Sequence, residues 1–157
     1  MNYNRKEQLQ AMNRQIKELS GVYRSALSRL GLSENEFWIW YALLIMEEAY
    51  SQQDLCDEWS LSKQTVNTII TGMVKKGYVE LRVVPGTRNR KIICVTEAGR
   101  SYGEQIIIPI AEAEQRAIEK VPMRERWICS AVLNKYIGFL KEEVDYGKTC
   151  LEKSPEI

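Results

Sequence analysis

The sequence predicts a mainly α-helical protein with one small β-hairpin, an α+β fold class that three observations support. Apolar residues recur every three or four positions over long stretches near both ends of the chain, as they do in amphipathic helices. Two short β-rich segments flank a Pro-Gly turn, as in a hairpin. Two short helical segments directly precede this hairpin, so the expected order is a helix-turn-helix with a wing.

The N-terminal part of the chain predicts two helices. The first is expected to end before Gly31. It carries an apolar stripe, narrow enough to pack against another helix, at Leu9, Met12, Ile16, Leu19, Tyr23, Ala26 and Leu30. Ser33 and Glu36 form a capping-box signature at the start of the second helix. Its consecutive large side chains, Phe37 to Tyr41, cover every face, so this helix should be mostly buried.

The middle of the chain predicts the helix-turn-helix. Ser51 and Asp54 mark the start of a short helix that runs to about Trp59. Ser62 is the N-cap candidate of the next helix, whose buried face should comprise Val66, Ile69, Ile70, Met73 and Val74. Its opposite face is polar and carries Lys63, Gln64, Asn67, Thr68, Thr71 and Lys75.

The wing follows Gly77, which should end this helix. The segments 78–84 and 91–95 are β-rich and predict two strands. The loop between them has no apolar residue beyond Pro85, so it should project into solvent.

Two helices are expected after the wing. Thr96 should cap a long helix that Pro109 breaks or bends, because proline removes one backbone hydrogen bond. The last helix should begin near Pro122 and reach Val144, with apolar side chains on more than one side. Residues 147–157 lose the periodicity and should form a frayed tail.

Positive charge is concentrated on the helix-turn-helix and the wing. The whole chain has a formal charge of only +1, yet residues 62–91 carry seven Lys and Arg side chains and one Glu, a local charge of +6. Such a concentration on one small module is typical of a surface that binds phosphates.

Two sets of side chains on this module are candidate contacts to double-stranded DNA. The helix opened at Ser62 offers amide and hydroxyl groups that can bind base edges in a major groove, and its set is Ser62, Lys63, Gln64, Thr65, Asn67, Thr68 and Thr71. The wing can reach the DNA backbone or a narrow minor groove with Thr87, Arg88, Asn89, Arg90 and Lys91. Either set alone could be an ordinary solvated surface, but their succession favours DNA contact.

Other functional classes are disfavoured. The chain has no histidine, and its four cysteines form no C-x-x-C pair, so neither a metal nor a cofactor is expected and enzyme activity is least favoured. No apolar run approaches the roughly 20 residues of a membrane span, and the N-terminus lacks the apolar core of a signal peptide. The expected location is therefore the cytoplasm, with no membrane contact.

Several segments resemble the MarR family of bacterial winged-helix transcriptional regulators, over nearly the whole chain. The most specific are LSKQTVNTIITGMVKKGYVELR and the later VTEAG, and GLSENEFWIWYALL and SQQDLCDEWS also fit. The resemblance implies a homodimer with interleaved terminal helices, so residues 1–32 and 97–146 would form a dimerisation region and residues 33–96 the DNA-binding domain. The interface would include Leu9, Met12, Ile16, Leu19, Trp127, Tyr136 and Leu140.

The resemblance also implies regulation, since many members release DNA when an aromatic compound binds. Trp38, Trp40 and Tyr41 are the candidate effector pocket, although packing in the core is the favoured role of such side chains. Thr87 stands where the family usually has a wing Asp, and Thr68 and Gly72 stand where arginines are frequent.

The sequence therefore predicts a sequence-specific DNA-binding regulator, a repressor in most such families, that binds an inverted-repeat operator as a homodimer. Two alternatives stay open. One is a winged helix that binds protein without DNA, and the other is a regulator that responds to oxidation of a cysteine.

Overall fold

The computed structural model describes residues 3–46, 48–87 and 89–152 of the chain, and the side chains of residues 4–145 within these ranges. It divides into two compact units, one up to Ala111 and one from Glu112 onward. The predicted division by role, at residues 32/33 and 96/97, stays a prediction. Arg88 of the wing and the tail residues 153–157 lie outside the described residues.

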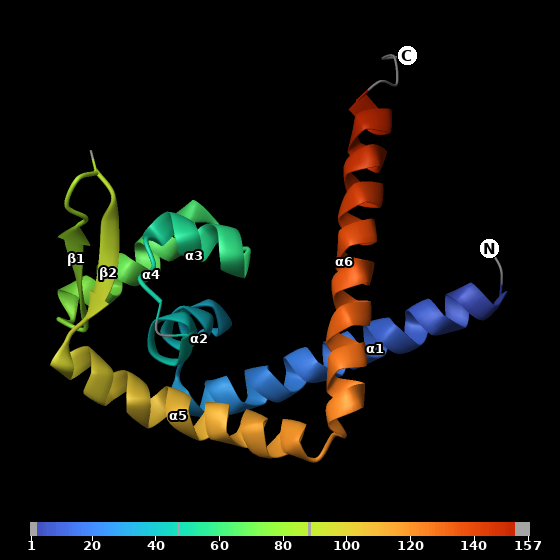
Figure 1. Cartoon of the computed structure of the whole chain (residues 1–157), viewed down its shortest axis with the longest axis horizontal. Helices are drawn as coiled ribbons and strands as arrows, with labels where there is room; N and C mark the ends of the chain where they lie inside the picture. The colour runs from blue at the N-terminus through green and yellow to red at the C-terminus, as the bar shows by residue number, and fades with distance from the viewer. Residues whose placement is uncertain (1–2, 47, 88, 153–157) are drawn as a thin grey trace. The chain divides into compact units, whose positions relative to one another are not determined.

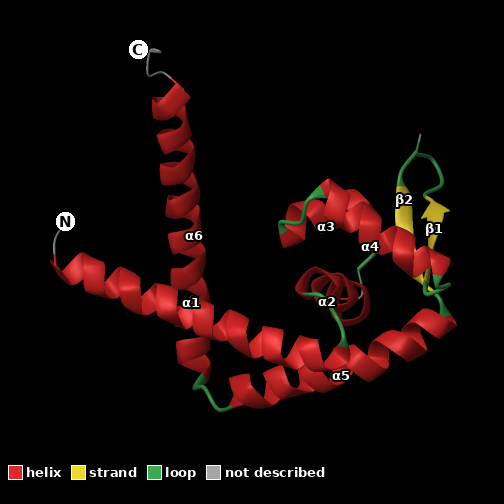
Figure 2. Cartoon of the chain, turned by 180° about the vertical axis from the view of Figure 1, so that it is seen from behind, coloured by secondary structure: helices red, strands yellow, loops and turns green. Residues whose placement is uncertain are grey.

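Most of the structural elements belong to the first unit. In chain order they are α1 (Tyr3–Leu30), α2 (Glu34–Tyr41), the π-helical turn η1 (Ala42–Met46), α3 (Gln52–Trp59), α4 (Lys63–Lys75), β1 (Val79–Val83), β2 (Lys91–Val95) and most of α5 (Glu97–Glu119). The second unit holds the end of α5 and α6 (Met123–Glu152). Figure 2 shows that the strands of the described chain are confined to one hairpin, which confirms the predicted fold class.

Side-chain caps set the helix starts where the sequence predicts them. The N–H of Glu36 donates to Ser33 Oγ at 3.2 Å at the start of α2. At the start of α3 the capping box is complete, because the N–H of Ser51 donates to Asp54 Oδ2 at 2.7 Å and the N–H of Asp54 donates to Ser51 Oγ at 3.2 Å. These bonds satisfy backbone donors that lack a partner inside the helix.

Helix α2 lies at the centre of the core, between α3 and α5 (Figure 1). Phe37, Ile39 and Trp40 are fully buried, as are Leu55 of α3 and Ile107 of α5. The prediction of a mostly buried second helix is therefore confirmed. The same apolar run continues as η1, so one helical segment of the sequence is an α-helix followed by a π-helical turn.

Two glycines allow helix α5 to lie close to this core. A Cβ at Gly99 would lie 1.9 Å from the carbonyl oxygen of Tyr78, and one at Gly103 would lie 2.5 Å from Leu44 Cδ1. Thr96 fixes the start of α5, as predicted: its hydroxyl donates to the carbonyl of Gly77 at 2.7 Å and accepts from the N–H of Gly99 at 3.0 Å. The end of α4 and the start of α5 are thereby joined.

Three details differ from the predictions. Helix α5 continues through the exposed Pro109 without the predicted break, and the alternative of a bend there stays a prediction. Val74 is 42% exposed because it lies about 80° around the helix from Val66, at the edge of the buried stripe. Helix α6 continues past Gly147 to Glu152. Apolar periodicity indicates a helix face that packs against another surface, and its loss after Gly147 does not prevent the residues from being helical.

Within the described residues, no helix combines the length and the apolar character that crossing a membrane requires.

Candidate nucleic-acid interface

Helix α4 has one buried face and one exposed face, as its spacing predicts. Val66, Ile70 and Met73 are at most 2% exposed and anchor the helix to the core. The opposite face is exposed and presents the uncharged polar side chains Gln64, Asn67, Thr68 and Thr71, with Lys63 and Lys75 at its two ends. These side chains recur at helical spacing, so the fold gathers them on one surface.

The start of α4 uses two of the predicted DNA contacts for its own cap. The N–H of Thr65 donates to Ser62 Oγ at 3.1 Å, and the two hydroxyl oxygens are 2.7 Å apart. Thr65 is also half-buried. The hydroxyl groups of both residues are thus engaged in the helix start, so the predicted base contacts fall mainly to the residues further along α4.

The turn before α4 and the turn after it are both left-handed. Ser60 ends α3 with a φ of 53°, and the N–H of Leu61 donates to the carbonyl of Cys56 at 3.2 Å. Gly77 follows α4 with a φ of 72°. The N–H of Tyr78 donates to the carbonyl of Met73 at 2.9 Å, the pattern of a Schellman cap that directs the chain into β1.

The wing is an antiparallel hairpin with Val79 opposite Val95 and Leu81 opposite Ile93. Pro85 and Gly86 occupy the centre of its turn, Gly86 with a φ of 80°, as a type II turn requires. Thr87, a predicted DNA contact, is exposed, and its hydroxyl donates to the carbonyl of Val84 within the turn at 2.8 Å.

The charged side chains of the wing are in different environments. Arg90 Nη2 lies 3.0 Å from Asp54 Oδ2 in α3, and Arg82 pairs with Glu80 on β1. Asn89 and Lys91 are exposed, and in the described part of the chain Lys91 has no ion-pair partner. The predicted contact Arg88 lies outside the described residues.

Asp54 is a charged group of this surface that the sequence predicts only as a helix cap. Hydrogen bonds from the Ser51 backbone and side chain, followed by the interaction with Arg90, lower the pKa of the Asp54 carboxyl. It is therefore ionised at neutral pH. No local spacing relates Asp54 to Arg90, since 36 positions separate them.

Strand β2 has a second connection to the segment before α3. The N–H of Ile93 donates to the carbonyl of Tyr50 at 2.8 Å, so one backbone hydrogen bond joins the two segments. Tyr50 is 3% exposed. Burial, together with a hydrogen bond to Glu58, raises the pKa of its phenol and keeps it neutral.

The three aromatic residues of the predicted effector pocket do not come together. Trp40 is fully buried and packs against Tyr78 and Tyr102, with ring centroids 6.0 and 5.7 Å away. Trp38 and Tyr41 are half-buried in another cluster around Trp59, whose ring stacks on Trp38 at 5.4 Å. In the second cluster Trp38, Tyr41 and Trp59 pack against one another.

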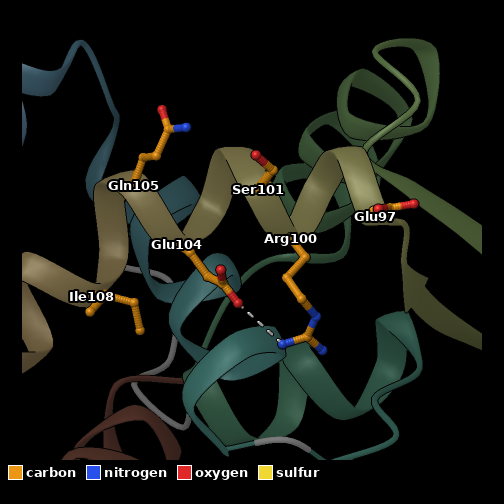
Figure 3. A pocket seen from close by; sticks show the side chains of 6 residues that line it. All are labelled: Glu97, Arg100, Ser101, Glu104, Gln105 and Ile108. Atoms are coloured by element: carbon orange, nitrogen blue, oxygen red, sulfur yellow. Dashed lines mark ion pairs between the residues drawn. The ribbon is translucent and has the colours of Figure 1, made fainter.

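A shallow hollow of about 570 Å³ lies elsewhere, along one side of α5 (Figure 3). Polar and charged residues predominate in its lining, which comprises Glu97, Arg100, Ser101, Glu104, Gln105 and Ile108. Arg100 and Glu104 pair across one turn with 3.5 Å between Nη1 and Oε1. Such a surface lacks the aromatic walls expected of an effector pocket.

The predicted dimer residues leave apolar surface uncovered within one chain. On α1, Leu9, Ile16 and Leu19 are 41%, 42% and 59% exposed, and Met12 is half-buried. On α6, Trp127 and Leu140 are 72% and 45% exposed, and Tyr136 is half-buried.

The cysteines differ in exposure. Cys56 and Cys94 are half-buried, whereas Cys129 on α6 is exposed. Among the described residues no group of three or more His, Cys, Asp and Glu side chains could hold a metal ion.

One family model matches part of the chain. Residues 30–88 match the model of the MarR family, a range that contains α2, α3, α4 and β1. No curated protein sequence matches the chain.

Solved structures match over most of the chain. A MarR family regulator from Neisseria meningitidis, NMB1585, superposes with a TM-score of 0.78 at 20% identity, covering 89% of this chain and 98% of that one. MepR from Staphylococcus aureus, in a DNA-binding conformation, gives 0.71 at 17% identity, covering 82% and 98%. A Listeria monocytogenes MarR family regulator complexed with a 26mer DNA gives 0.66 at 16%, covering 95% and 97%. The chain shares the fold of these regulators.

Proposed function

We propose that this chain, whose residues 30–88 match the MarR family model, is a transcriptional repressor that binds an inverted-repeat operator as a homodimer. The main support is the exposed face of α4, where amide and hydroxyl side chains lie between Lys63 and Lys75. In this proposal Gln64, Asn67, Thr68 and Thr71 read base edges in a major groove. The wing contacts the adjacent backbone or minor groove.

The exposed apolar side chains of α1 and α6 support the homodimer. Leu19 and Trp127 are more than half exposed, and a second copy of the chain is the occupant that would cover both helices. Two winged helices related by a two-fold axis would then meet half-sites about one helical turn, roughly 34 Å, apart.

A small aromatic effector stays a prediction of the sequence. The separation of the aromatic residues favours Trp38 and Tyr41 as its contacts over Trp40, which lies in the other cluster. Such a compound would have to enter a cluster in which Trp38 and Trp59 already stack.

The proposed base contacts can be tested by selecting bound duplexes from a randomised pool. Gln64→Ala and Asn67→Ala should each relax the base preference at one position of each half-site, at a cost of about 1 to 3 kcal/mol for the preferred site. Gln105→Ala removes an exposed amide from α5 and should change nothing. An unaltered preference in both α4 variants would refute their proposed role.

A further inference from the structure

We propose that Arg90 is a positioning residue that holds the wing against α3 through Asp54, and that it does not bind a DNA phosphate itself. This role rests on the proposed DNA-binding function. Within that function, Arg90 would position the wing instead of contacting DNA. The contact joins α3 to the wing, and both α3 and strand β1 of the wing lie beside α4 (Figure 1).

The partner of Arg90 is itself held in place. Asp54 Oδ2, which lies 3.0 Å from Arg90 Nη2, also accepts the N–H of Ser51 at 2.7 Å. That bond belongs to the capping box at the start of α3. The guanidinium therefore meets an acceptor whose position is set by the start of a helix.

Charge strengthens this contact. The hydrogen bonds from Ser51 keep the pKa of Asp54 below its ordinary value, so a carboxylate faces the guanidinium at neutral pH. The Asp54 side chain is 31% exposed and that of Arg90 is 55% exposed, so solvent screens the pair only in part.

The backbone places Arg90 at the base of the wing loop, directly before β2. Its carbonyl accepts the N–H of Val84 at 2.8 Å, which closes the loop that holds the Pro85–Gly86 turn. Nearby, the N–H of Ile93 donates to the carbonyl of Tyr50 at 2.8 Å. Segment 50–54 is thus tied to the wing twice, once through the backbone and once through the Asp54–Arg90 pair.

A rigid base should orient the rest of the wing toward DNA. Lys91 is exposed and, among the described residues, has no ion-pair partner, so it is a wing cation that is free to bind a phosphate. In the alternative, Arg90 itself binds a DNA phosphate, and Asp54 competes with that phosphate for Arg90. The two roles predict opposite effects of removing the Asp54 charge.

The pair can first be tested without DNA, by following the Asp54 carboxyl in an NMR titration. Arg90→Ala should raise the pKa of Asp54 toward its ordinary value, but only in part, because the Ser51 hydrogen bonds remain. Lys91→Ala should leave it unchanged. An Asp54 pKa that is the same with and without Arg90 would overturn the anchoring role.

The second test measures duplex affinity against salt concentration. Asp54→Asn, which can keep the capping bond, and Arg90→Ala should each weaken binding about two- to fivefold without changing the log–log slope, and the double variant should be no weaker. Lys91→Ala should reduce the slope by about 1. Asp57→Asn is the matched control, because it removes a charge from α3 on a residue bonded to Gln53 rather than to the wing.

Tighter binding of Asp54→Asn, or a slope reduced by about 1 in Arg90→Ala, would show that Arg90 contacts phosphate and would overturn the proposal. A wild-type protein that shows no salt-dependent binding would instead refute the proposed function. The NMR titration would still decide whether Arg90 anchors the wing.

Discussion

Phe37 and Trp40 of α2 expose none of their surface, whereas Trp127 and Phe139 of α6 expose 72% and 65% of theirs. Burial of one large apolar side chain stabilises a fold by about 1.5 to 3 kcal/mol, so the two regions gain very different amounts from a single chain. The winged-helix module packs around its own core. The exposed apolar side chains of α6 stabilise the protein only when another surface buries them. In the proposed function that surface belongs to a second copy of the chain.

The largest expected effects test this contrast directly. Phe37→Ala should lower the free energy of unfolding by about 3 to 5 kcal/mol, because it leaves a cavity in the core. Trp127→Ala should leave the unfolding free energy of the monomer nearly unchanged and weaken dimerisation about tenfold or more. Denaturant unfolding and analytical ultracentrifugation would measure the two quantities.

The contrast fails if Trp127→Ala destabilises a dilute, monomeric sample as much as Phe37→Ala does. It fails equally if sedimentation finds only monomers of the wild-type chain at every concentration, since α6 would then have no second copy to cover it.

A smaller effect on the free energy of unfolding is expected from replacing a glycine by alanine, which adds one methyl group. The substitution can be made in both α4 and α5. Gly99→Ala should lower the free energy of unfolding by about 1 to 3 kcal/mol or more, since the new Cβ would meet the Tyr78 carbonyl. Gly72→Ala, with nothing within 4 Å of the new Cβ, should raise it by about 0.5 to 1 kcal/mol.

Thermal and denaturant unfolding of both glycine variants would measure these changes. Equal effects in the two variants would mean that α5 does not approach the Tyr78 carbonyl as closely as the structure shows. The close packing of the start of α5 against the end of α4 would then be refuted.

Local signals account for the parts of the fold that the sequence predicts well. Ser51 and Ser62 mark the helix starts because their side chains bond to backbone groups within a few residues. Gly77 and Gly86 mark turns because their conformations are left-handed. Each signal depends on neighbours in the chain, so it can be recognised without knowledge of the tertiary structure.

The remaining features depend on contacts between distant segments. Trp38 and Trp40 are two positions apart in one helix and therefore point into different clusters, which composition alone does not reveal. The Asp54–Arg90 pair depends on how the wing packs against α3. The sequence predicts Arg90 as a DNA contact because an unpaired arginine in a basic loop is indistinguishable, at that level, from a paired one.

Hydroxyl-radical footprinting of a selected operator tests the central claim most directly. Two winged helices presented by one homodimer should protect two tracts centred about one helical turn, roughly 34 Å, apart, with matching sequences in inverted orientation. A single protected tract, or uniform protection without a preferred sequence, would contradict the proposed two-fold presentation of α4 and the wing.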